Sequence, residues 1–380
     1  MSTPLLLKGF EVELFTGRDD GSHVGVAAEV AQELPDFVTE PDHRNLEYIT
    51  APTSSYAELP ELLLQPRRRL RDWLQQRNLT LLPGSTLSRG DTRRFERSDP
   101  TNPYHDLIEQ SYGTRVVTAS IHINLGITDP EWLFAAVRLV RCEAALLLAL
   151  SASSPFLDDE VTGQHSQRWR QFPLTPEKVP LFLNHSHYIR WVEEQLAEGL
   201  MRNERHLWTS VRPNGPRRPY DLNRLELRIC DLVTDPAELI AITALLELRL
   251  LQLHDAPQQL DPIRSSRLTA EELATLADAN DAAAAHQSLD ATLHRWQDGS
   301  SVTCRAWIEE LLDQISPLAQ QHNLLSQLRP MDDLLGNGNQ AMRWINAVET
   351  GTSISALLHQ GSLTMSDQEQ RSTPMSGALG

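Results

Sequence analysis

Apolar and polar residues alternate along the first strand-like segment of the chain. In GFEVELFTG, residues 9–17, apolar residues alternate with Glu11 and Glu13, which is the period of two expected of a β-strand with one apolar face. Both carboxylates therefore point to the same side. Like charges this close repel each other unless water screens them or a cation lies between them. The pattern predicts a strand and leaves both explanations open.

Four further segments have the composition and alternation of strands. Together with the first, the predicted strands span residues 10–15, 45–50, 80–82, 116–126 and 224–232. Helical segments lie between them: Pro66 is predicted to open one helix, and the Asp-Pro-Glu run at 129–131 to open an apolar helix that runs to Leu150. Strands mixed with helices in this way predict an α+β fold.

Beyond residue 236 the apolar residues recur every three or four positions, which is the spacing of amphipathic helices. This spacing predicts helices over residues 237–254, 269–286, 304–322 and 331–348. We expect a single domain over residues 1–360, with a sheet-forming part at about 8–236 and a helical part at about 237–348. Residues 361–380 are rich in Ser, Gln, Thr, Gly and Met without periodicity, and are expected to form a disordered tail.

The chain carries a formal net charge of -17 over 380 residues. Its long-range field repels phosphate, which argues against general binding of nucleic acid or of acidic membranes. Positive charge is almost entirely arginine, since Lys8 and Lys178 are the only lysines, and the sequence contains no G-x-x-x-x-G-K-[ST] loop. Any phosphate ligand must therefore be met by local arginines or by metal ions.

Neither the cysteines nor the longest apolar run indicates a secreted or membrane protein. Cys142, Cys230 and Cys304 are too few and too scattered for a disulfide framework or a four-cysteine metal site. The first two stand among apolar residues, as buried inert thiols do. The N-terminus lacks a signal-peptide pattern, and charged residues interrupt the apolar run 132–150, which is predicted as a core helix. We expect a reduced, cytoplasmic protein.

Two more acids extend the pair on the first strand. Glu40 precedes a proline in VTEPDHRNLEYIT, which favours an extended or turn conformation, and Glu47 lies on an alternating strand. Neighbouring strands would bring Glu11, Glu13, Glu40 and Glu47 together. Hard divalent cations prefer carboxylate oxygens, and Mg²⁺ commonly bridges protein carboxylates and phosphate oxygens. Four acids are about the right supply for more than one ion.

Two later strands carry polar residues on one face. In ASIHINLG, His122 and Asn124 share a face, and a lone histidine on a strand is either a hydrogen-bonded structural residue or a ligand. In LELRICD, Glu226 and Arg228 share a face. This carboxylate and arginine form either a plain intrastrand ion pair or a metal ligand beside a phosphate clamp.

Arginines in two turn-rich segments are candidate anion ligands. Arg168 in TGQHSQRW and Arg212 in SVRPN are able to address a carboxylate or phosphate through two parallel hydrogen bonds, although exposed arginines commonly just solvate a surface. The cluster Arg67–Arg71 is interpreted as a solvated helix face rather than a phosphate site. The sequence shows neither zinc-type ligand spacing nor the signature of a nucleophilic serine or cysteine.

In their order along the chain, these segments resemble the ATP-dependent glutamate-cysteine ligases, and specifically the short cyanobacterial type of that family. The matching segments are GFEVELFTG, EPDxRNxEYxTAP, LLPGSTLS, SDPxNPYH, VVTASIHINLGI, LALSASSPFLD, HYIRWVEEQL, HLWxSVRPNGxRRPYDLNRLELRICDLVTD and AITALLELRLLQL. Each motif alone is weak, whereas the ordered set is highly specific. The resemblance runs from about Lys8 to His254 and continues more weakly to about Val348.

The resemblance implies a fold and a reaction. The expected fold is α+β, with a glutamine-synthetase-like curved, largely antiparallel sheet, helices packed on its outer face and the active site on its concave face. The expected reaction joins L-glutamate to L-cysteine with ATP and gives γ-glutamylcysteine, ADP and phosphate, the first step of glutathione biosynthesis. It requires Mg²⁺ or Mn²⁺, and we expect the catalytic domain to act as a monomer or homodimer.

The resemblance also assigns roles to individual residues. The positions that match the family's metal site are Glu11, Glu13, Glu40, Glu47, His122 and Glu226. Arg228 matches an arginine associated with the transferred phosphate, and Arg168 one associated with the amino-acid substrate. We expect Glu226 and Arg228 to be catalytic, Arg228 to contact the nucleotide, and Arg212 and Asn124 to bind substrate together with Arg168.

One segment departs from the family pattern. NDAAAA, residues 280–285, stands where wider relatives often carry arginines near the nucleotide, which leaves the adenine and triphosphate contacts unassigned. Two alternatives stay open: a carboxylate-amine ligase with a different amine acceptor, and a non-catalytic sensor of amino acids or nucleotides on the same fold. The full set of metal-ligand positions argues against the sensor, which has no need of a complete metal site.

Overall fold

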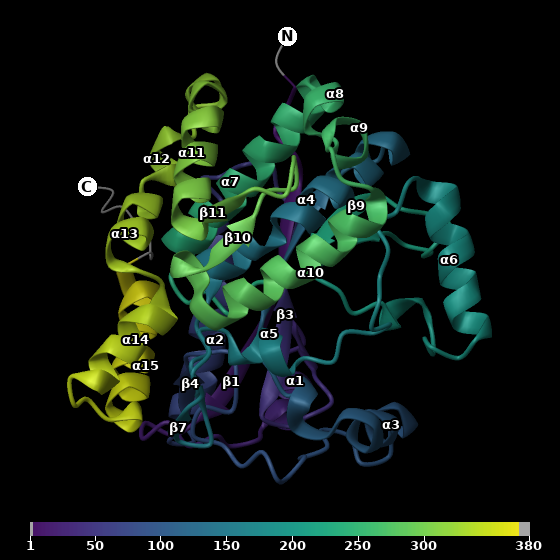
Figure 1. The fold of residues 1–380 in the computed structure, drawn as a ribbon. Helices are drawn as coiled ribbons and strands as arrows, with labels where there is room; N and C mark the ends of the chain where they lie inside the picture. Colours follow the sequence, from purple (N-terminus) through teal and green to yellow (C-terminus); the bar gives the residue numbers. More distant parts are fainter. Residues whose placement is uncertain (1–2, 372–380) are drawn as a thin grey trace, which may run out of the picture.

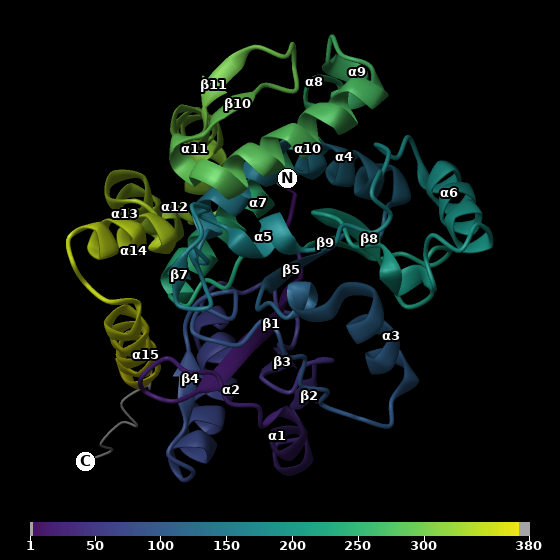
Figure 2. The same cartoon turned by 60° about the horizontal axis from the view of Figure 1, so that its bottom comes forward.

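The computed structural model of the chain describes residues 3–371. Within them, seven strands form one sheet in which every neighbouring pair is antiparallel. The strands are β1 (Lys8–Gly17), β2 (Phe37–Thr39), β3 (Asn45–Ile49), β4 (Thr80–Leu82), β5 (Ile121–Gly126), β8 (Val211–Asn214) and β9 (Arg224–Leu227). Their order is β2-β3-β1-β5-β9-β8, with β4 paired to the end of β1, and Figure 2 shows them following one another across the molecule.

Helices and two small hairpins make up most of the remaining structure. The helices are α1 (Ala27–Glu33), α2 (Leu59–Gln75), α3 (Pro103–Tyr112), α4 (Pro130–Ser151), α5 (Gln167–Gln171), α6 (His185–Ala197), α7 (Pro236–Asp255), α8 (Pro257–Leu260), α9 (Pro262–Ser265), α10 (Ala270–Gln287), α11 (Cys304–Gln321), α12 (Leu325–Leu328), α13 (Pro330–Asn337), α14 (Gln340–Glu349) and α15 (Ile354–Arg371). The 3₁₀ turns are η1 (Gly113–Val116), η2 (Glu204–His206) and η3 (Ser288–Asp290), and the hairpins are β6–β7 (Phe156–Leu157, Glu160–Val161) and β10–β11 (Thr292–His294, Ser301–Thr303). Figure 1 shows α4, α7 and α10 lying together over the strands.

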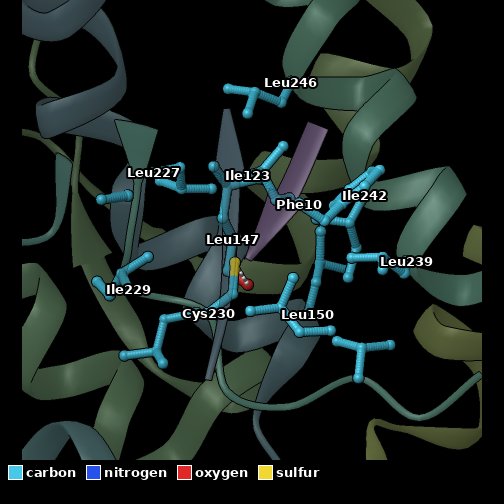
Figure 3. Close-up of a cluster of buried hydrophobic side chains, with 14 of the residues drawn as sticks. Phe10, Ile123, Leu147, Leu150, Leu227, Ile229, Cys230, Leu239, Ile242 and Leu246 are labelled. Atoms are coloured by element: carbon cyan, nitrogen blue, oxygen red, sulfur yellow. Dashed lines mark hydrogen bonds between the residues drawn. The ribbon is translucent and has the colours of Figure 1, made fainter. Parts of the chain in front are cut away.

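One face of the sheet is apolar because alternate residues of its strands point to it. Phe10 of β1, Ile123 of β5 and Leu227 of β9 are buried there. Figure 3 shows these side chains meeting residues of α4 and α7, among them Leu147 and Ile242. Burying this face directs the intervening residues of each strand, which carry the polar groups, to the other face. The predicted α+β class with a largely antiparallel sheet and helices packed on it is confirmed.

Two predicted strands are longer than the strands observed. The strand expected over 116–126 begins at Ile121, because the chain up to Val116 forms the turn η1. The strand expected over 224–232 ends at Leu227. Beyond that residue, two successive backbone amides both donate to the carbonyl of Ser210 instead of continuing the ladder. The other three predicted strands lie within two residues of their observed ends.

Two helix predictions are wrong in their bounds. α2 begins at Leu59, with Pro60 in its first turn and Pro66 inside it, because its apolar residues form one continuous buried stripe. This packing outweighs the cost of about 3 kcal/mol that an internal proline imposes. The helix expected over 331–348 is two helices, α13 and α14, separated at Gly338, whose φ of 83° is a conformation that glycine adopts without strain.

The end of the described chain contradicts the predicted disordered tail. Residues 361–371 complete α15, and Glu369 of this helix accepts hydrogen bonds from Arg67 and Arg71 of α2. All three side chains are buried, so the expectation of a solvated arginine face is wrong for these two arginines. Removing one partner would leave a buried charge unpaired, and the pairing therefore ties α15 to α2. Residues 372–380 of the predicted tail lie outside the described residues.

No helix among residues 3–371 combines the length and the apolar character that a membrane span requires. The apolar run at 132–150 belongs to α4 and is buried along almost its whole length, as predicted for a core helix. Its charged residues are paired: Arg138 with Asp261 at 2.7 Å, and Glu143 with Arg249 at 2.6 Å. Pairing makes their burial tolerable between packed helices.

Candidate active site

The register of the sheet places the acids of β1 beside polar residues of both neighbouring strands. Glu13 lies directly opposite Glu47 of β3, and Glu11 directly opposite His122 of β5. Opposed residues on one face of a sheet have Cβ atoms about 4.5–5.5 Å apart. Alternation along each strand decides the face on which these side chains lie, and strand pairing decides which of them become neighbours.

Glu11, His122 and Glu226 form the first triad. Each residue offers one ligand atom, and these atoms lie within 4.8 Å of one another. His122 Nδ1 is 2.9 Å from Glu11 Oε2 and 3.8 Å from Glu226 Oε1. Asn124, which is paired with Glu226 across β5 and β9, donates to Glu11 Oε1 at 3.2 Å. Two carboxylates and an imidazole in this arrangement are able to hold a divalent cation.

Glu13, Glu40 and Glu47 form the second triad, and their ligand atoms also lie within 4.8 Å of one another. Glu13 is oriented by Ser120, whose amide and hydroxyl both donate to Oε2 at 2.8 Å. Glu40 comes from the loop between β2 and β3. A set of carboxylates alone suits a hard cation that prefers oxygen ligands.

A buried ion pair holds the loop that carries Glu40. Arg44 donates to both carboxylate oxygens of Asp42, at 2.8 and 2.7 Å, and both side chains are buried. The Ser98 hydroxyl donates to the carbonyl of Glu40 itself. Bidentate pairing of this kind is strong and geometrically specific, so the loop presents the Glu40 carboxylate from a fixed backbone.

The second triad is electrostatically unfavourable as three anions. Burial and the charge of Glu13 raise the pKa of Glu40 to about 8. Burial, followed by the charges of Glu40 and Glu11, raises the pKa of Glu47 to about 10. Crowded carboxylates in a poorly solvated site hold protons at neutral pH unless a cation replaces them. This observation fits a site built to receive a cation.

The first triad has the opposite electrostatics. Burial disfavours the charged form of Glu226, but the charges of Arg212 and Arg228 outweigh it and hold the pKa well below its usual range. Burial also opposes ionisation of Glu11, and the hydrogen bond from His122 outweighs it, so that the pKa of Glu11 is lowered. Both acids of the first triad are therefore ionised at neutral pH.

Arg212, which was predicted to bind substrate, pairs instead with Glu226. It is buried on the edge strand β8 and donates to both oxygens of Glu226, at 2.7 and 3.0 Å. Its remaining terminal nitrogen donates to the carbonyls of Arg205 and Leu207. Asn214, two residues along the same strand, donates to Glu226 Oε2 at 2.6 Å. Arg212 and Asn214 therefore orient Glu226 rather than a ligand.

A cavity of about 350 Å³ opens beside the second triad and is called the first cavity. It is lined by Glu13, Thr39, Glu40, Pro41, Asp42, Asn45, Tyr104, His105, Ile108, Val116, Val117, Thr118, Ser120, His122, Arg168, Phe172, Arg205, Trp208 and Arg228. Among these residues, Glu13 and Glu40 belong to the second triad and His122 to the first. The aromatic side chains come from α3 and from loops outside the sheet.

Arg168, predicted to contact the amino-acid substrate, lines the first cavity. Its Nη1 and Nη2 donate to the carbonyls of Ile229 and Arg228, both at 2.9 Å. Asp231 lies 3.7 Å from Nη1 and adds an opposite charge behind the guanidinium. Arg168 Nε is buried and has no hydrogen-bond partner among residues 3–371.

A second cavity, of about 480 Å³, lies beside the first triad. It is lined by Leu7, Gly9, Phe10, Glu11, Ile49, Thr50, Pro52, Asn124, Gly126, Thr128, Asn223 and Arg224. Arg224 Nε donates to Asn124 Oδ1 at 3.1 Å. Asn124, predicted to bind substrate, thus lies in a different cavity from Arg168. Glu11 of the first triad lines this second cavity, whereas His122 of the same triad lines the first cavity.

The segment 280–285, where the family pattern led us to look for nucleotide contacts, lies away from both cavities. Asn280 exchanges two hydrogen bonds with the backbone of His294, at 2.8 and 2.9 Å. Asp281 pairs with the buried Arg141 at 3.0 Å. These contacts hold α10 against its neighbours, which explains the two polar residues without a ligand.

Three residues that orient the site are absent from the predicted set: Ser120, Asn214 and Arg224. Each stands two residues from a predicted site residue, with Ser120 directly before β5, Asn214 on β8 and Arg224 on β9. Ser120 and Arg224 lie within predicted strands, where period-two alternation placed their side chains on the site face and was sufficient to find them. Alternation does not show which of them makes a hydrogen bond, because that depends on the neighbouring strand.

Comparison with known proteins shows the family of the chain. The family model for glutamate-cysteine ligase family 2 (GCS2) matches residues 7–366. The chain belongs to this family. A relative from Thermobifida fusca (strain YX) named "Putative glutamate--cysteine ligase 2" is 27% identical over 344 residues, which cover 87% of this chain and 83% of the relative. A relative of the same name from Solibacter usitatus is 27% identical over 364 residues, 92% and 90% of the two chains.

Two solved structures share the fold at low sequence identity. The first is glutamate-cysteine ligase from Francisella tularensis in complex with AMP, with a TM-score of 0.74 and 14% identity, covering 98% of this chain and 90% of that chain. The second is a bifunctional glutathione synthetase from Pasteurella multocida, with a TM-score of 0.71 and 17% identity, covering 96% and 53%. At these identities the likeness establishes the fold, and the fold expected from the resemblance is confirmed.

Proposed function

We propose that this protein is an ATP- and divalent-cation-dependent ligase that joins the γ-carboxylate of L-glutamate to the amine of L-cysteine. One observation carries the proposal: six acidic and histidine side chains at family-matching positions meet in two triads, whose members line two cavities. Membership of the GCS2 family supports the same reaction class. The products are γ-glutamylcysteine, ADP and phosphate.

The donor atoms of the two triads fit Mg²⁺ or Mn²⁺. Five carboxylates and one imidazole are hard, oxygen-rich ligands, and the protons that crowding places on Glu40 and Glu47 are replaceable by a cation. The first triad, Glu11, His122 and Glu226, would hold one ion. The second triad would hold another. When bound, these ions neutralise the triphosphate and stabilise charge on the transferred phosphoryl group.

We assign the second cavity to the nucleotide. Gly9 and Gly126 leave part of its wall without side chains, and Leu7 and Ile49 expose 55% and 62% of their surface. An open apolar surface of this kind suits the flat face of a purine. Arg224 adds a positive charge at its edge. A base bound here would direct its phosphates past the first triad.

We assign the first cavity to the two amino acids. Arg168 and Arg228 line this cavity, and guanidinium groups are donors suited to carboxylates. The reacting γ-carboxylate would lie near the second triad, between these donors and the bound cations. The aromatic wall, which includes Phe172 and Trp208, would face the side chain of the acceptor.

The chemistry follows from the poor reactivity of a carboxylate. In the first step, an oxygen of the glutamate γ-carboxylate bonds to the γ-phosphorus of ATP, and the bond from that phosphorus to the β,γ-bridging oxygen breaks to release ADP. In the second step, the amine of cysteine bonds to the activated carbonyl carbon, loses a proton and expels phosphate. Arg228 lies where the first cavity meets the first triad and is suited to contact the phosphoryl group. Holding the reactants in adjoining cavities supplies much of the rate enhancement.

This route needs no nucleophile from the protein, and the cysteines are unsuited to be one. All three are buried free thiols, and none lines either cavity. Burial raises the pKa of Cys230 to about 12 and raises the pKa of Cys142 further. A thiol that stays protonated at neutral pH is a weak nucleophile.

The test is an assay of the purified, folded chain with ATP, Mg²⁺, L-glutamate and L-cysteine. We expect ADP release that depends on both amino acids, and a product with the mass of γ-glutamylcysteine. Omission of Mg²⁺ should abolish both signals. Folded protein that releases no ADP under these conditions would contradict the proposal.

A different amine acceptor is the second candidate function. Tyr104, Phe172 and Trp208 line the first cavity, and an aromatic wall suits an apolar acceptor. The same assay, run with apolar and aromatic amino acids or amines in place of cysteine, separates the candidates. Faster turnover with one of them would move the proposal to that acceptor. Tight ATP binding without product from any acceptor would favour a sensor.

A further inference from the structure

Glu226 is a candidate metal ligand whose oxygens already accept four hydrogen bonds. Oε1 accepts from Arg212 Nη2 at 3.0 Å and from Arg228 Nη1 at 2.5 Å. Oε2 accepts from Arg212 Nε at 2.7 Å and from Asn214 Nδ2 at 2.6 Å. Each carboxylate oxygen has about two acceptor positions. A bond from Glu226 to a metal ion must therefore replace one of these donors.

Two of the three donor side chains are fixed in place. Arg212 Nη1 donates to the carbonyls of Arg205 and Leu207 at 3.0 and 2.8 Å, and Asn214 Oδ1 accepts from the amide of Gly215 at 2.7 Å. Both side chains are buried. Moving either one would leave several buried polar groups without partners, which costs about 1–3 kcal/mol for each group.

Arg228 is the donor that is able to leave. It lines the first cavity, which neither Arg212 nor Asn214 does. Its backbone is anchored, because its amide donates to the carbonyl of Ser210 at 2.8 Å and its own carbonyl accepts from Arg168. Rotation of the side chain alone would therefore carry the guanidinium into the cavity.

Arg228 and a divalent cation need the same atoms. Arg228 Nη1 is 2.5 Å from Glu226 Oε1 and 3.3 Å from His122 Nδ1, and these two atoms of the first triad are themselves 3.8 Å apart. We propose that Arg228 exchanges partners: it pairs with Glu226 in the metal-free protein and turns into the first cavity when a divalent cation binds the first triad. This inference rests on the proposed function, which identifies the triad as the cation site of a ligase.

The exchange makes anion binding in the first cavity depend on the cation. While Arg228 pairs with Glu226, its charge is neutralised by that carboxylate. Once released, the guanidinium faces the cavity in which the phosphoryl group is transferred, and it offers two parallel donors to phosphate oxygens. Binding of the divalent cation and binding of the phosphoryl group therefore favour each other.

Two crystal structures of the full chain test the exchange directly: one of metal-free protein, and one with Mn²⁺ and no nucleotide, in which anomalous scattering locates the ion. We expect Mn²⁺ between Glu11, His122 and Glu226, and Arg228 beyond hydrogen-bond distance of Glu226. Mn²⁺ bound to Glu226 with Arg228 still donating to the same oxygen would overturn the inference.

Mn²⁺ titration in solution provides a second test that does not depend on turnover. Arg228→Ala should bind the first-triad ion about tenfold more tightly than wild type, because no arginine has to leave. Arg217→Ala is the matched control, since the guanidinium of Arg217 is 80% exposed and pairs with Asp221 rather than with a triad residue. This variant should bind Mn²⁺ as wild type does. Equal affinities of wild type and Arg228→Ala would overturn the exchange.

Inorganic phosphate serves as the probe for the released arginine. In wild type, Mg²⁺ should strengthen phosphate binding at least tenfold, and Arg228→Ala should lose most of that gain. Arg228→Lys, which keeps a charge but not the paired donors, should retain part of it and serves if the alanine variant does not fold. A gain that is the same in wild type and in both variants contradicts the exchange.

The exchange and the proposed ligase activity fail separately. Protein that shows the movement of Arg228 but releases no ADP with any acceptor would remove the ligase proposal and leave the exchange. Protein that makes γ-glutamylcysteine while Arg228 stays on Glu226 in the Mn²⁺ structure would do the reverse.

Discussion

The two triads present carboxylates to a cation with opposite local chemistry. In the first triad, Glu226 accepts four hydrogen bonds from two arginines and an asparagine, and Glu11 accepts one from His122. In the second triad, no arginine in the described part of the chain donates to any of the three carboxylates. The first triad is therefore ionised and oriented before a cation arrives, whereas the second holds protons that a cation must replace.

The difference follows from position in the sheet. Glu226 lies on β9, between β5 and the edge strand β8, and the edge strand supplies Arg212 from behind. Glu47 lies on β3, where its neighbours across the ladders are Glu13 and Val38. A carboxylate beside a cationic side chain is stable in its ionised form without a metal ion. A carboxylate beside another carboxylate needs a metal ion to stabilise that form. Each prediction below tests one side of this contrast.

The largest effect should come from Glu226→Gln. It removes a charge that two arginines and one cation site share, so turnover should fall by at least about a hundredfold, as expected for loss of a metal ligand and its hydrogen-bond network. Steady-state kinetics measure the loss, and circular dichroism shows whether the fold is kept. Glu177→Gln, at an exposed position, is the matched control. Retained turnover in folded Glu226→Gln would remove Glu226 from the metal site.

The second prediction concerns the pH dependence of stability without metal. The pKa of Glu47 is raised to about 10 in the folded chain, so between its unfolded value near 4.5 and about 10 only the unfolded state releases the proton. Stability should therefore fall as pH rises through this window, by a few kcal/mol in order of magnitude. Glu47→Gln should flatten the loss. Urea denaturation of wild type and Glu47→Gln in EDTA at pH 5 and pH 8 measures it, and the same change with pH in both proteins would show that Glu47 ionises freely.

Ser120→Ala should weaken ion binding at both triads. It removes the hydroxyl that donates to Glu13 and lies 3.1 Å from His122 Nε2, and it leaves the backbone amide bond to Glu13 in place. Loss of one orienting hydrogen bond to a metal ligand reduces affinity by about tenfold. Mn²⁺ titration of wild type and variant provides the comparison, and an unchanged affinity at either ion would show that the hydroxyl does not orient that triad.

The smallest effect should be the number of protons that the protein releases when a divalent cation binds. Loading the protein with Mg²⁺ at pH 7 should release between about one and two protons, because the raised pKa values of Glu40 and Glu47 leave both acids largely protonated. Calorimetry in buffers of different ionisation enthalpy measures the number. Glu47→Gln should reduce it by about one, and raising the pH from 6 to 8 should tighten binding. Release that is unchanged in this variant would place the protons elsewhere.

Much of the site could be predicted because the alternation of residues along a strand shows from the local sequence which side chains share a face. Alternation around Glu11, His122 and Glu226 showed which side chains lie together on a strand, and the ordered motifs indicated the family before any fold was known. Glu40 was found through its motif rather than its pattern, since it lies in a loop. The family and the fold class expected from these features are confirmed.

Other parts could not be predicted because they depend on distant contacts. Arg212 was assigned to substrate, and only the neighbouring strand shows that its donors are used by Glu226. The helix over residues 361–371 looked disordered because its composition is mostly polar. Three of its residues, Ser362, Met365 and Glu369, are nevertheless buried, and the partners of Glu369 lie about 300 residues away on α2. Pro66 looked like a helix start because tertiary packing is absent from a local pattern.

By itself, the sequence determined which face of each strand carries the chemistry and which residue types supply it. A side-chain period of two is a local property that holds wherever a strand folds. Only the tertiary structure decided that six ligand residues divide into two triads, because the partners of each carboxylate depend on the strand beside it. That pairing is set by the core on the opposite face and by the connections between strands. It is also the reason that arginines lie beside the carboxylates of the first triad and do not donate to those of the second.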